Sequence, residues 1–139
     1  MEFTRRDLSR LLPLVAAARA AGQSGQLASQ MYPFEALPVH GEGPNREWPV
    51  FEGMGHAGVR IELHETELAP GQMPHPAHHH THEEMILVRE GTMEVTIAGK
   101  SATLGPGGVG FVASNDEHGW RNVGAGRARY FVLAVGQDS

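Results

Sequence analysis

From about residue 48 onward, the chain consists of short apolar segments separated by turns rich in glycine and proline. Side chains of a β-strand alternate between its two faces, so alternation of apolar and polar residues predicts half-buried strands. Short strands joined by Gly/Pro turns are typical of a sandwich or barrel. We therefore expect an all-β antiparallel fold, with strands at residues 59–64, 84–90, 93–97, 102–104, 109–113 and 130–135.

The composition excludes several classes of function. The chain has 139 residues, enough for one domain with its own core. It has no cysteine, which rules out disulfides, iron–sulfur clusters and thiol catalysis. A net charge of -5 does not favour a nucleic-acid partner. No apolar run reaches the ~18 residues that a membrane span needs.

The first thirty residues differ from the rest. Arg5 and Arg6 precede an apolar stretch at residues 11–18, and the whole resembles a twin-arginine export signal. This predicts a periplasmic or secreted protein. The alternative is an amphipathic N-terminal helix on a cytoplasmic protein. The domain boundaries that we predict are an export signal and start of a linker at 1–30, an extended arm at 31–45 and a barrel domain at 46–139.

Five of the nine histidines fall in one short stretch before Glu84. On an extended segment His78 and His80 point one way and His79 the other. Glu84 continues the first face, and His82 does so if the strand runs straight. Imidazoles with a carboxylate suit Fe, Mn, Ni, Zn or Cu, and the absence of thiolates removes the softest preferences. A histidine-rich tract can also be a loose surface chelator, so the cluster alone leaves both interpretations open.

The spacing around this cluster is informative. His78-x-His80-x3-Glu84-x6-Gly91 resembles the first motif of the cupin superfamily, G-x5-H-x-H-x3/4-E-x6-G. Gly71 stands one residue further upstream than the motif places its first glycine.

A second motif of that superfamily, G-x5-P-x-G-x2-H-x3-N, follows downstream. Gly107, His118 and Asn122 match it, whereas Ala113 and Asn115 replace its proline and its middle glycine. Asparagine tolerates a left-handed backbone better than other residues with a side chain, so we expect the turn to persist.

The resemblance covers about residues 46–136 and identifies the chain as a small single-domain cupin. It implies a double-stranded β-helix, or jelly-roll, antiparallel barrel with a metal at its inner wall. It also implies that His78, His80, Glu84 and His118 bind one divalent metal ion. His82 is a minor alternative to one of these ligands.

The same resemblance implies structural roles elsewhere. The family's structural glycines fall on Gly91 and Gly107, and Asn122 is expected to hold its turn together. A homodimer through the outer sheet is implied as well. Arg89 faces away from Glu84 by strand parity, so we expect it on the surface or at the dimer contact.

Four protein ligands leave one or two positions open on a six-coordinate ion, which permits catalysis. We expect a metal-dependent enzyme that acts on a small oxygenated or aromatic molecule, dioxygenase-like or otherwise a lyase, decarboxylase or isomerase. The alternative is a non-catalytic cupin that binds a small molecule or sugar and keeps a structural metal. His64 and Tyr130 are candidate acid–base groups, but the sequence does not place them in the pocket.

Overall fold

The computed structural model describes residues 25–137. Within them the chain forms eight β-strands and a three-residue 3-10 helix, η3 (Phe34–Ala36). The strands are β1 (Asn45–Met54), β2 (Arg60–Leu68), β3 (Glu83–Glu90), β4 (Met93–Ile97), β5 (Lys100–Leu104), β6 (Val109–Val112), β7 (His118–Asn122) and β8 (Ala128–Val135).

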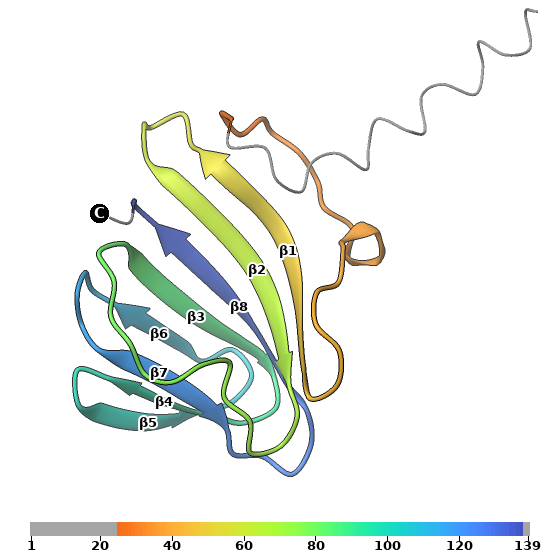
Figure 1. Cartoon of the computed structure of the whole chain (residues 1–139), viewed down its shortest axis with the longest axis vertical. Coiled ribbons are helices and arrows are strands. Elements are labelled where there is room, and N and C mark those ends of the chain that lie inside the picture. Colours follow the sequence, from red (N-terminus) through yellow and green to blue (C-terminus); the bar gives the residue numbers. More distant parts are fainter. Residues whose placement is uncertain (1–24, 138–139) are drawn as a thin grey trace, which may run out of the picture.

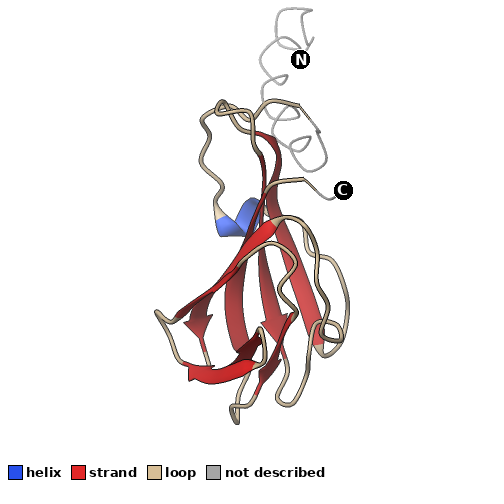
Figure 2. Ribbon diagram, turned by 90° about the vertical axis from the view of Figure 1, so that its left-hand side faces the viewer, coloured by secondary structure: helices blue, strands red, loops and turns tan. Residues whose placement is uncertain are grey.

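The strands form two antiparallel sheets. The larger sheet has the order β1-β2-β8-β3-β6, and the smaller has the order β5-β4-β7. Long strands of the larger sheet curve past the short strands of the smaller one (Figures 1 and 2). This arrangement confirms the predicted all-β antiparallel jelly-roll.

The predicted export signal, residues 1–30, lies almost entirely outside the described residues. Export and location therefore stay predictions. Within residues 25–137, no helix has the length and apolar character needed to cross a membrane.

The core fills the space between the two sheets. Alternate residues of β8 are buried, and they face buried residues of β3, β4 and β7. Burial of these apolar side chains is the main term that holds the sheets together. The core consists of Leu68, Ile86, Val88, Met93, Val95, Val112, Trp120, Ala128, Tyr130 and Val132.

Side chains directly opposite one another on neighbouring strands share a face. Ala134 on β8 is opposite Glu62 on β2 and opposite Glu84 on β3. Val132 is opposite His64 in the same way. Glu62 and His64 therefore face the interior beside Glu84, on the inner wall of the larger sheet.

The six predicted strands correspond to β2–β6 and β8 to within a few residues, whereas β1 and β7 have no counterpart among the predicted segments. β2 extends to Leu68 and is longer than the predicted segment at 59–64. Its apolar residues Ile61 and Leu63, whose alternation identified it, lie on the outer face, because Glu62 and His64 occupy the inner one. Burial by other parts of the chain, not periodicity alone, decides which face is the inner one.

Part of the predicted arm covers the outer face of the larger sheet. Phe34 packs on Trp48, with ring centroids 5.3 Å apart. The guanidinium of Arg129 lies 5.4 Å from the Phe34 ring and 5.2 Å from the Trp48 ring, a distance at which a cation is attracted to an aromatic face. The arm is thus anchored to the sheet through aromatic and cationic contacts.

A buried carboxylate lies beside this contact. Oε1 of Glu67 accepts hydrogen bonds from Arg46 and Arg127, and Oε2 accepts one of 2.8 Å from Arg129. Burial alone would raise the pKa of Glu67, but hydrogen bonds from Arg46 and Arg129 outweigh it and hold the pKa below its usual value. Arg89 lies on the same outer face, as predicted, and its Nη1 is 2.6 Å from Oε1 of buried Glu65.

Asn122 has the structural role that the sequence predicted. Its Nδ2 donates to the carbonyl oxygens of Leu68 and Gly126, each at 2.9 Å, and its Oδ1 accepts from the backbone N–H of Gly124 at 2.9 Å. The side chain thereby ties the β7–β8 loop to the end of β2.

Candidate metal centre

Backbone pairing brings His78 and His118 together. His78 lies just before β3, yet its N–H and C=O both bond to those of His118 on β7, at 3.0 and 2.9 Å. Opposed residues of an antiparallel pair share a face, so both rings point into the same space. Their centroids are 4.8 Å apart. The His78 segment therefore extends the smaller sheet beyond β7.

Hydrogen bonds to the backbone orient two of the rings. Nδ1 of His118 lies 2.9 Å from the carbonyl oxygen of Asp116, and Nδ1 of His80 lies 2.9 Å from that of His82. A carbonyl only accepts, so each Nδ1 carries the proton and each Nε2 presents a lone pair. Both Nε2 atoms are buried without a hydrogen-bond partner among the described residues. Buried polar atoms without a partner are rare, and here they indicate a site for a ligand.

Glu84 supplies a carboxylate from the opposite sheet. Its Oε2 lies 3.0 Å from Nε2 of His80, without the alignment of a hydrogen bond, and its Oε1 lies 3.8 Å from Nε2 of His118. Glu84 is buried, and its side chain is 10% exposed. A buried carboxylate beside three imidazoles is favourable for a cation.

The cluster has the dimensions of a metal site. Ligand atoms of His78, His80 and His118 all lie within 4.8 Å of one another. Ligands on opposite sides of a first-row ion lie about 4.2 Å apart, so only small side-chain movements are needed. The three imidazoles and one carboxylate are thus suitable for one divalent ion.

Charge around His78 favours the neutral imidazole. Burial, and the nearby imidazoles of His75, His118 and His80, lower the pKa of His78. A histidine binds metal only when its imidazole is neutral. The lowered pKa therefore lets His78 act as a ligand at a lower pH than an ordinary histidine.

The remaining histidines of the tract differ in position. His79 is exposed, as the parity argument predicted. His82 lies near the cluster: its Nε2 is 3.4 Å from Oε2 of Glu84, and its ring stacks on that of His80 at 3.5 Å. Ligand atoms of His80, His82 and Glu84 also lie within 4.8 Å of one another. His82 therefore remains an alternative ligand.

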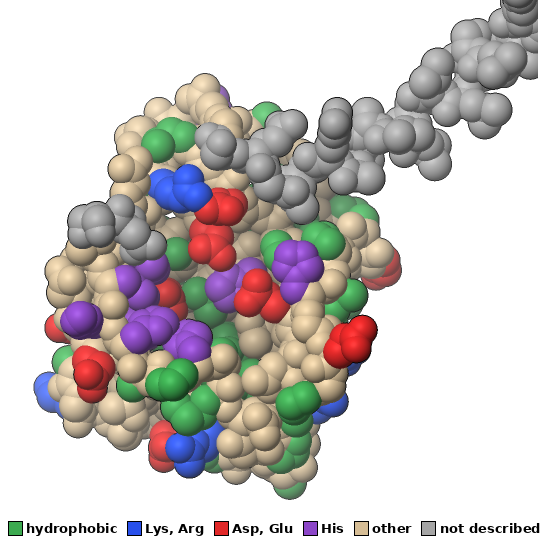
Figure 3. Space-filling view, in the orientation of Figure 1, with side chains coloured by type: hydrophobic (Ala, Val, Ile, Leu, Met, Phe, Trp, Pro, Cys, Tyr) green, Lys and Arg blue, Asp and Glu red, His purple; other side chains and the backbone are tan. Residues whose placement is uncertain are grey.

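Histidine and acidic side chains gather on the face where the two sheets open (Figure 3). Sequence reasoning did not identify Glu62 as part of this wall, although it shares strand parity with His64. Nδ1 of His64 lies 2.8 Å from Oε1 of Glu62. Tyr130 lies deeper, fully buried, and burial raises the pKa of its phenol.

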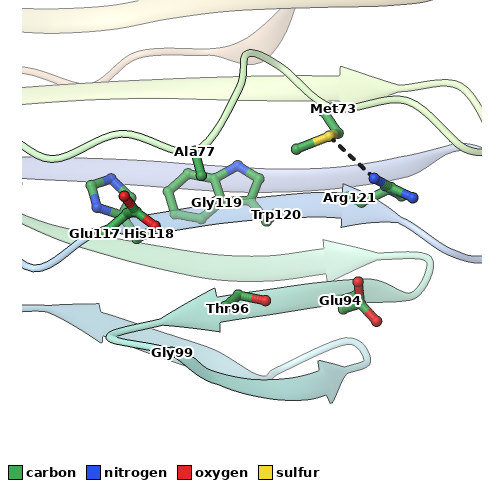
Figure 4. A pocket seen from close by; sticks show the side chains of 10 residues that line it. All are labelled: Met73, Ala77, Glu94, Thr96, Gly99, Glu117, His118, Gly119, Trp120 and Arg121. Atoms are coloured by element: carbon green, nitrogen blue, oxygen red, sulfur yellow. Dashed lines mark hydrogen bonds between the residues drawn. The ribbon is translucent and has the colours of Figure 1, made fainter.

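A separate hollow of about 240 Å³ lies on the other side of the smaller sheet. Its walls include Glu94 and Arg121, which oppose each other on β4 and β7 and face away from Trp120. Figure 4 shows Ala77 lying over β7 and the side chain of Arg121 reaching Met73, whose Sδ it contacts at 3.5 Å. His118 and Trp120 also line this hollow, so it borders the candidate metal centre across β7 (Figure 4).

An antiparallel jelly-roll with imidazoles and a carboxylate on its inner wall defines a β-barrel protein with a side-chain cluster suitable for a metal ion. The chain belongs to the cupin family, because its residues 64–135 match the profile of the Cupin domain. No curated protein is similar enough to count as a match.

Solved structures share the fold. KdgF from Halomonas sp. superposes with a TM-score of 0.65 at 15% identity, covering 77% of this chain and 94% of that one. A predicted oxalate decarboxylase from Thermotoga maritima gives 0.65 at 17% identity, covering 78% and 100%. The polyketide cyclase RemF from Streptomyces resistomycificus gives 0.62 at 21% identity, covering 80% and 82%. At these identities the likeness establishes the fold alone.

Proposed function

We propose that the protein is a metal-dependent enzyme that acts on a small oxygenated or aromatic molecule, with dioxygenase-like chemistry as the leading reaction. The observation that carries the proposal is the pair of buried, unpartnered Nε2 atoms of His80 and His118 beside the carboxylate of Glu84. Enzymes are among the fold neighbours, in agreement with this proposal: they include a polyketide cyclase and a predicted oxalate decarboxylase.

His78, His80, Glu84 and His118 are the residues that we assign as ligands of one Fe, Mn, Ni, Zn or Cu ion. Such an ion, when bound, supplies Lewis acidity and, if it is redox-active, electron transfer with O2. The four side chains set the position and net charge of the centre. Because only four ligands come from the protein, a substrate with two adjacent oxygens can complete the coordination.

The charge of the surrounding wall favours a neutral substrate. Glu47 and Glu62 lie near His64 on this wall, in addition to Glu84. A small cavity of about 100 Å³ there contains one arginine among its described lining residues, Arg60, and that residue is paired with Glu52. A dianion would meet repulsion from these carboxylates, whereas a neutral catechol, flavonol or β-diketone would not.

The test uses the metal-loaded full chain and a panel of chelating compounds. The panel contains a flavonol and a β-diketone as neutral members, 4-nitrocatechol as a coloured catechol that ionises near neutral pH, and oxalate and a 2-oxo acid as anionic members. We expect neutral members to perturb the metal absorption and at least one to cause oxygen uptake. Both effects should be absent in Glu84→Ala and present in His79→Ala, a matched change at an exposed histidine of the same tract.

A second candidate is a non-catalytic cupin that binds a small molecule or sugar. The observation that favours it is the close packing of the interior, where the rings of Trp120 and Tyr130 fill the space beneath His118. Binding of several panel members without oxygen uptake or product would support this function. If no compound perturbs the metal absorption, the metal is structural and the enzyme proposal is wrong.

A further inference from the structure

Two titratable side chains on the inner face of β2 are not part of the metal cluster. Nδ1 of His64 lies 2.8 Å from Oε1 of Glu62. The His64 side chain is 19% exposed and that of Glu62 is 43% exposed. Since a carboxylate accepts the hydrogen bond, Nδ1 of His64 carries the proton. The other ring nitrogen, Nε2, is then the atom that can take a proton from a bound molecule.

The strand register places this pair beside the metal centre. Glu62, Ala134 and Glu84 form one row across β2, β8 and β3. Neighbouring strands lie about 4.8 Å apart, so the backbones at Glu62 and Glu84 are about 10 Å apart. The side chain between them is only the methyl group of Ala134. A molecule of a few heavy atoms fits in this interval.

An open space lies along the same row. A cavity of about 100 Å³ is lined by Glu62, Ala134 and His82, with Glu52, Arg60 and Gly136. Glu62 of the pair and His82 of the histidine tract thus border the same space. A ligand that extends along this row from the metal centre comes within reach of the pair.

The charged groups around His64 favour proton acceptance. Burial alone would lower the pKa of His64, but the hydrogen bond to Glu62 and the charges of Glu47, Glu62 and Glu84 outweigh it and raise the pKa. The hydrogen bond to His64 in turn lowers the pKa of Glu62, so the carboxylate stays ionised. Glu47 faces this space from β1 and Glu84 from β3.

Tyr130, the other acid–base candidate, does not suit this role. It is fully buried, and burial raises the pKa of its phenol. A phenol that stays protonated at neutral pH is a poor base. His64 is the better placed of the two.

We propose that His64 is the general base for a substrate hydroxyl that chelates at the metal centre, and that Glu62 is its positioning residue. This inference rests on the proposed function. In the step, the substrate O–H bond breaks, the proton bonds to Nε2 of His64, and the oxygen keeps the electron pair. The proton on Nδ1 stays in the hydrogen bond to Glu62, which stabilises the resulting imidazolium.

The test follows the ionisation of 4-nitrocatechol, whose visible spectrum changes when a hydroxyl loses its proton. The probe is titrated with pH in metal-loaded wild type, His64→Gln and Glu62→Gln. We expect the pKa of the bound probe to be about one pH unit higher in His64→Gln. At a pH within the transition, the ratio of ionised to neutral probe is then about tenfold lower than in wild type. Glu62→Gln should show a smaller shift in the same direction. Metal content should not change in either variant.

Two further variants separate local from general effects. His56→Gln changes an exposed histidine of the β1–β2 loop that bonds to the backbone of Leu27 and does not line the cavity, and it should behave like wild type. Ala134→Leu fills the space between Glu62 and Glu84 and should abolish probe binding while the metal is retained. If His64→Gln fails to fold, Glu62→Gln and Ala134→Leu carry the test.

The outcomes distinguish the two proposals. Identical titrations in wild type, His64→Gln and Glu62→Gln would overturn the role of the pair and leave the proposed function intact. Metal-loaded wild type that does not bind the probe would count against the proposed function itself, and the inference would fail with it. Loss of metal in His64→Gln would assign His64 a structural role instead.

Discussion

Oε1 of Glu84 lies 3.8 Å from Nε2 of His118, although Glu84 belongs to the larger sheet and His118 to the smaller one. The candidate metal centre therefore joins the two sheets at the mouth of the barrel. A bound cation would couple them, because it would contact side chains of both.

Replacement of Glu84 or of His118 by alanine should abolish stoichiometric metal binding. In Glu84→Ala the cluster loses its only carboxylate of the four, and in His118→Ala it loses the ligand that is most buried. Metal content after purification without a histidine tag is the measurement. His79→Ala is the matched control and should keep full occupancy. His82→Ala tests the alternative ligand, and full occupancy in both ligand variants would contradict the assignment.

The affinity for metal should fall as the pH drops below about 6.5, because imidazoles must lose their proton to bind. Burial and the neighbouring imidazoles lower the pKa of His78, which keeps this ligand neutral below the usual range. Titration of metal release against pH checks this. A release curve that does not depend on pH between 5 and 7 would argue against histidine ligands.

Glu67→Gln should destabilise the fold by about 2–3 kcal/mol at pH 7, because charge-assisted hydrogen bonds with three arginines are weakened. The sign of the pH dependence follows from the lowered pKa of Glu67 in the folded state. Its contribution is fully present above the unfolded pKa of ~4.3 and is lost as the pH falls through the lower, folded pKa. Urea unfolding of wild type and variant should therefore converge below pH ~4. A constant difference across this range would exclude the linkage.

Gly91→Ala should be more destabilising than Gly107→Ala, although both glycines have a positive φ, +84° and +86°. A Cβ at Gly91 would lie 2.7 Å from Cα of Ala128, whereas nothing lies within 4 Å of one at Gly107. The left-handed backbone alone costs about 1–2 kcal/mol for alanine. The clash at Gly91 should add about 1–3 kcal/mol. Thermal unfolding of the two variants side by side gives the comparison.

We propose that the protein forms a homodimer through the outer face of its larger sheet. Leu87, Val109 and Phe111 are 38%, 56% and 53% exposed there, and Leu87 lies opposite Val109. Contiguous exposed apolar side chains of this kind mark interaction surfaces. Sedimentation should give a dimer at micromolar protein, and Phe111→Lys should shift it towards monomer. A wild-type monomer under these conditions would refute the proposal, and Val59→Lys, at an exposed residue of the β1–β2 turn, is the control.

The pattern of residues along the chain was sufficient to predict the fold class, and the resemblance to the cupin motifs predicted the four candidate ligands. Alternation and Gly/Pro turns predicted six of the eight strands within residues 25–137, because a period of two and a positive φ are local properties of the chain. The left-handed backbone of Asn115, with φ of 65°, was predicted in this way. The common orientation of His78 and His80 likewise follows from local geometry, since residues two apart on extended backbone share a face.

Which side chains meet across the barrel could not be predicted without the three-dimensional fold. The pairing of His78 with His118, and the position of Ala134 between Glu62 and Glu84, depend on strand register across the sheets. Register is set by the packing of whole sheets and by long-range loop closure, neither of which is encoded in any short segment. For the same reason the sequence could not show that β2 turns its polar residues inward, where Glu62 and His64 line the site.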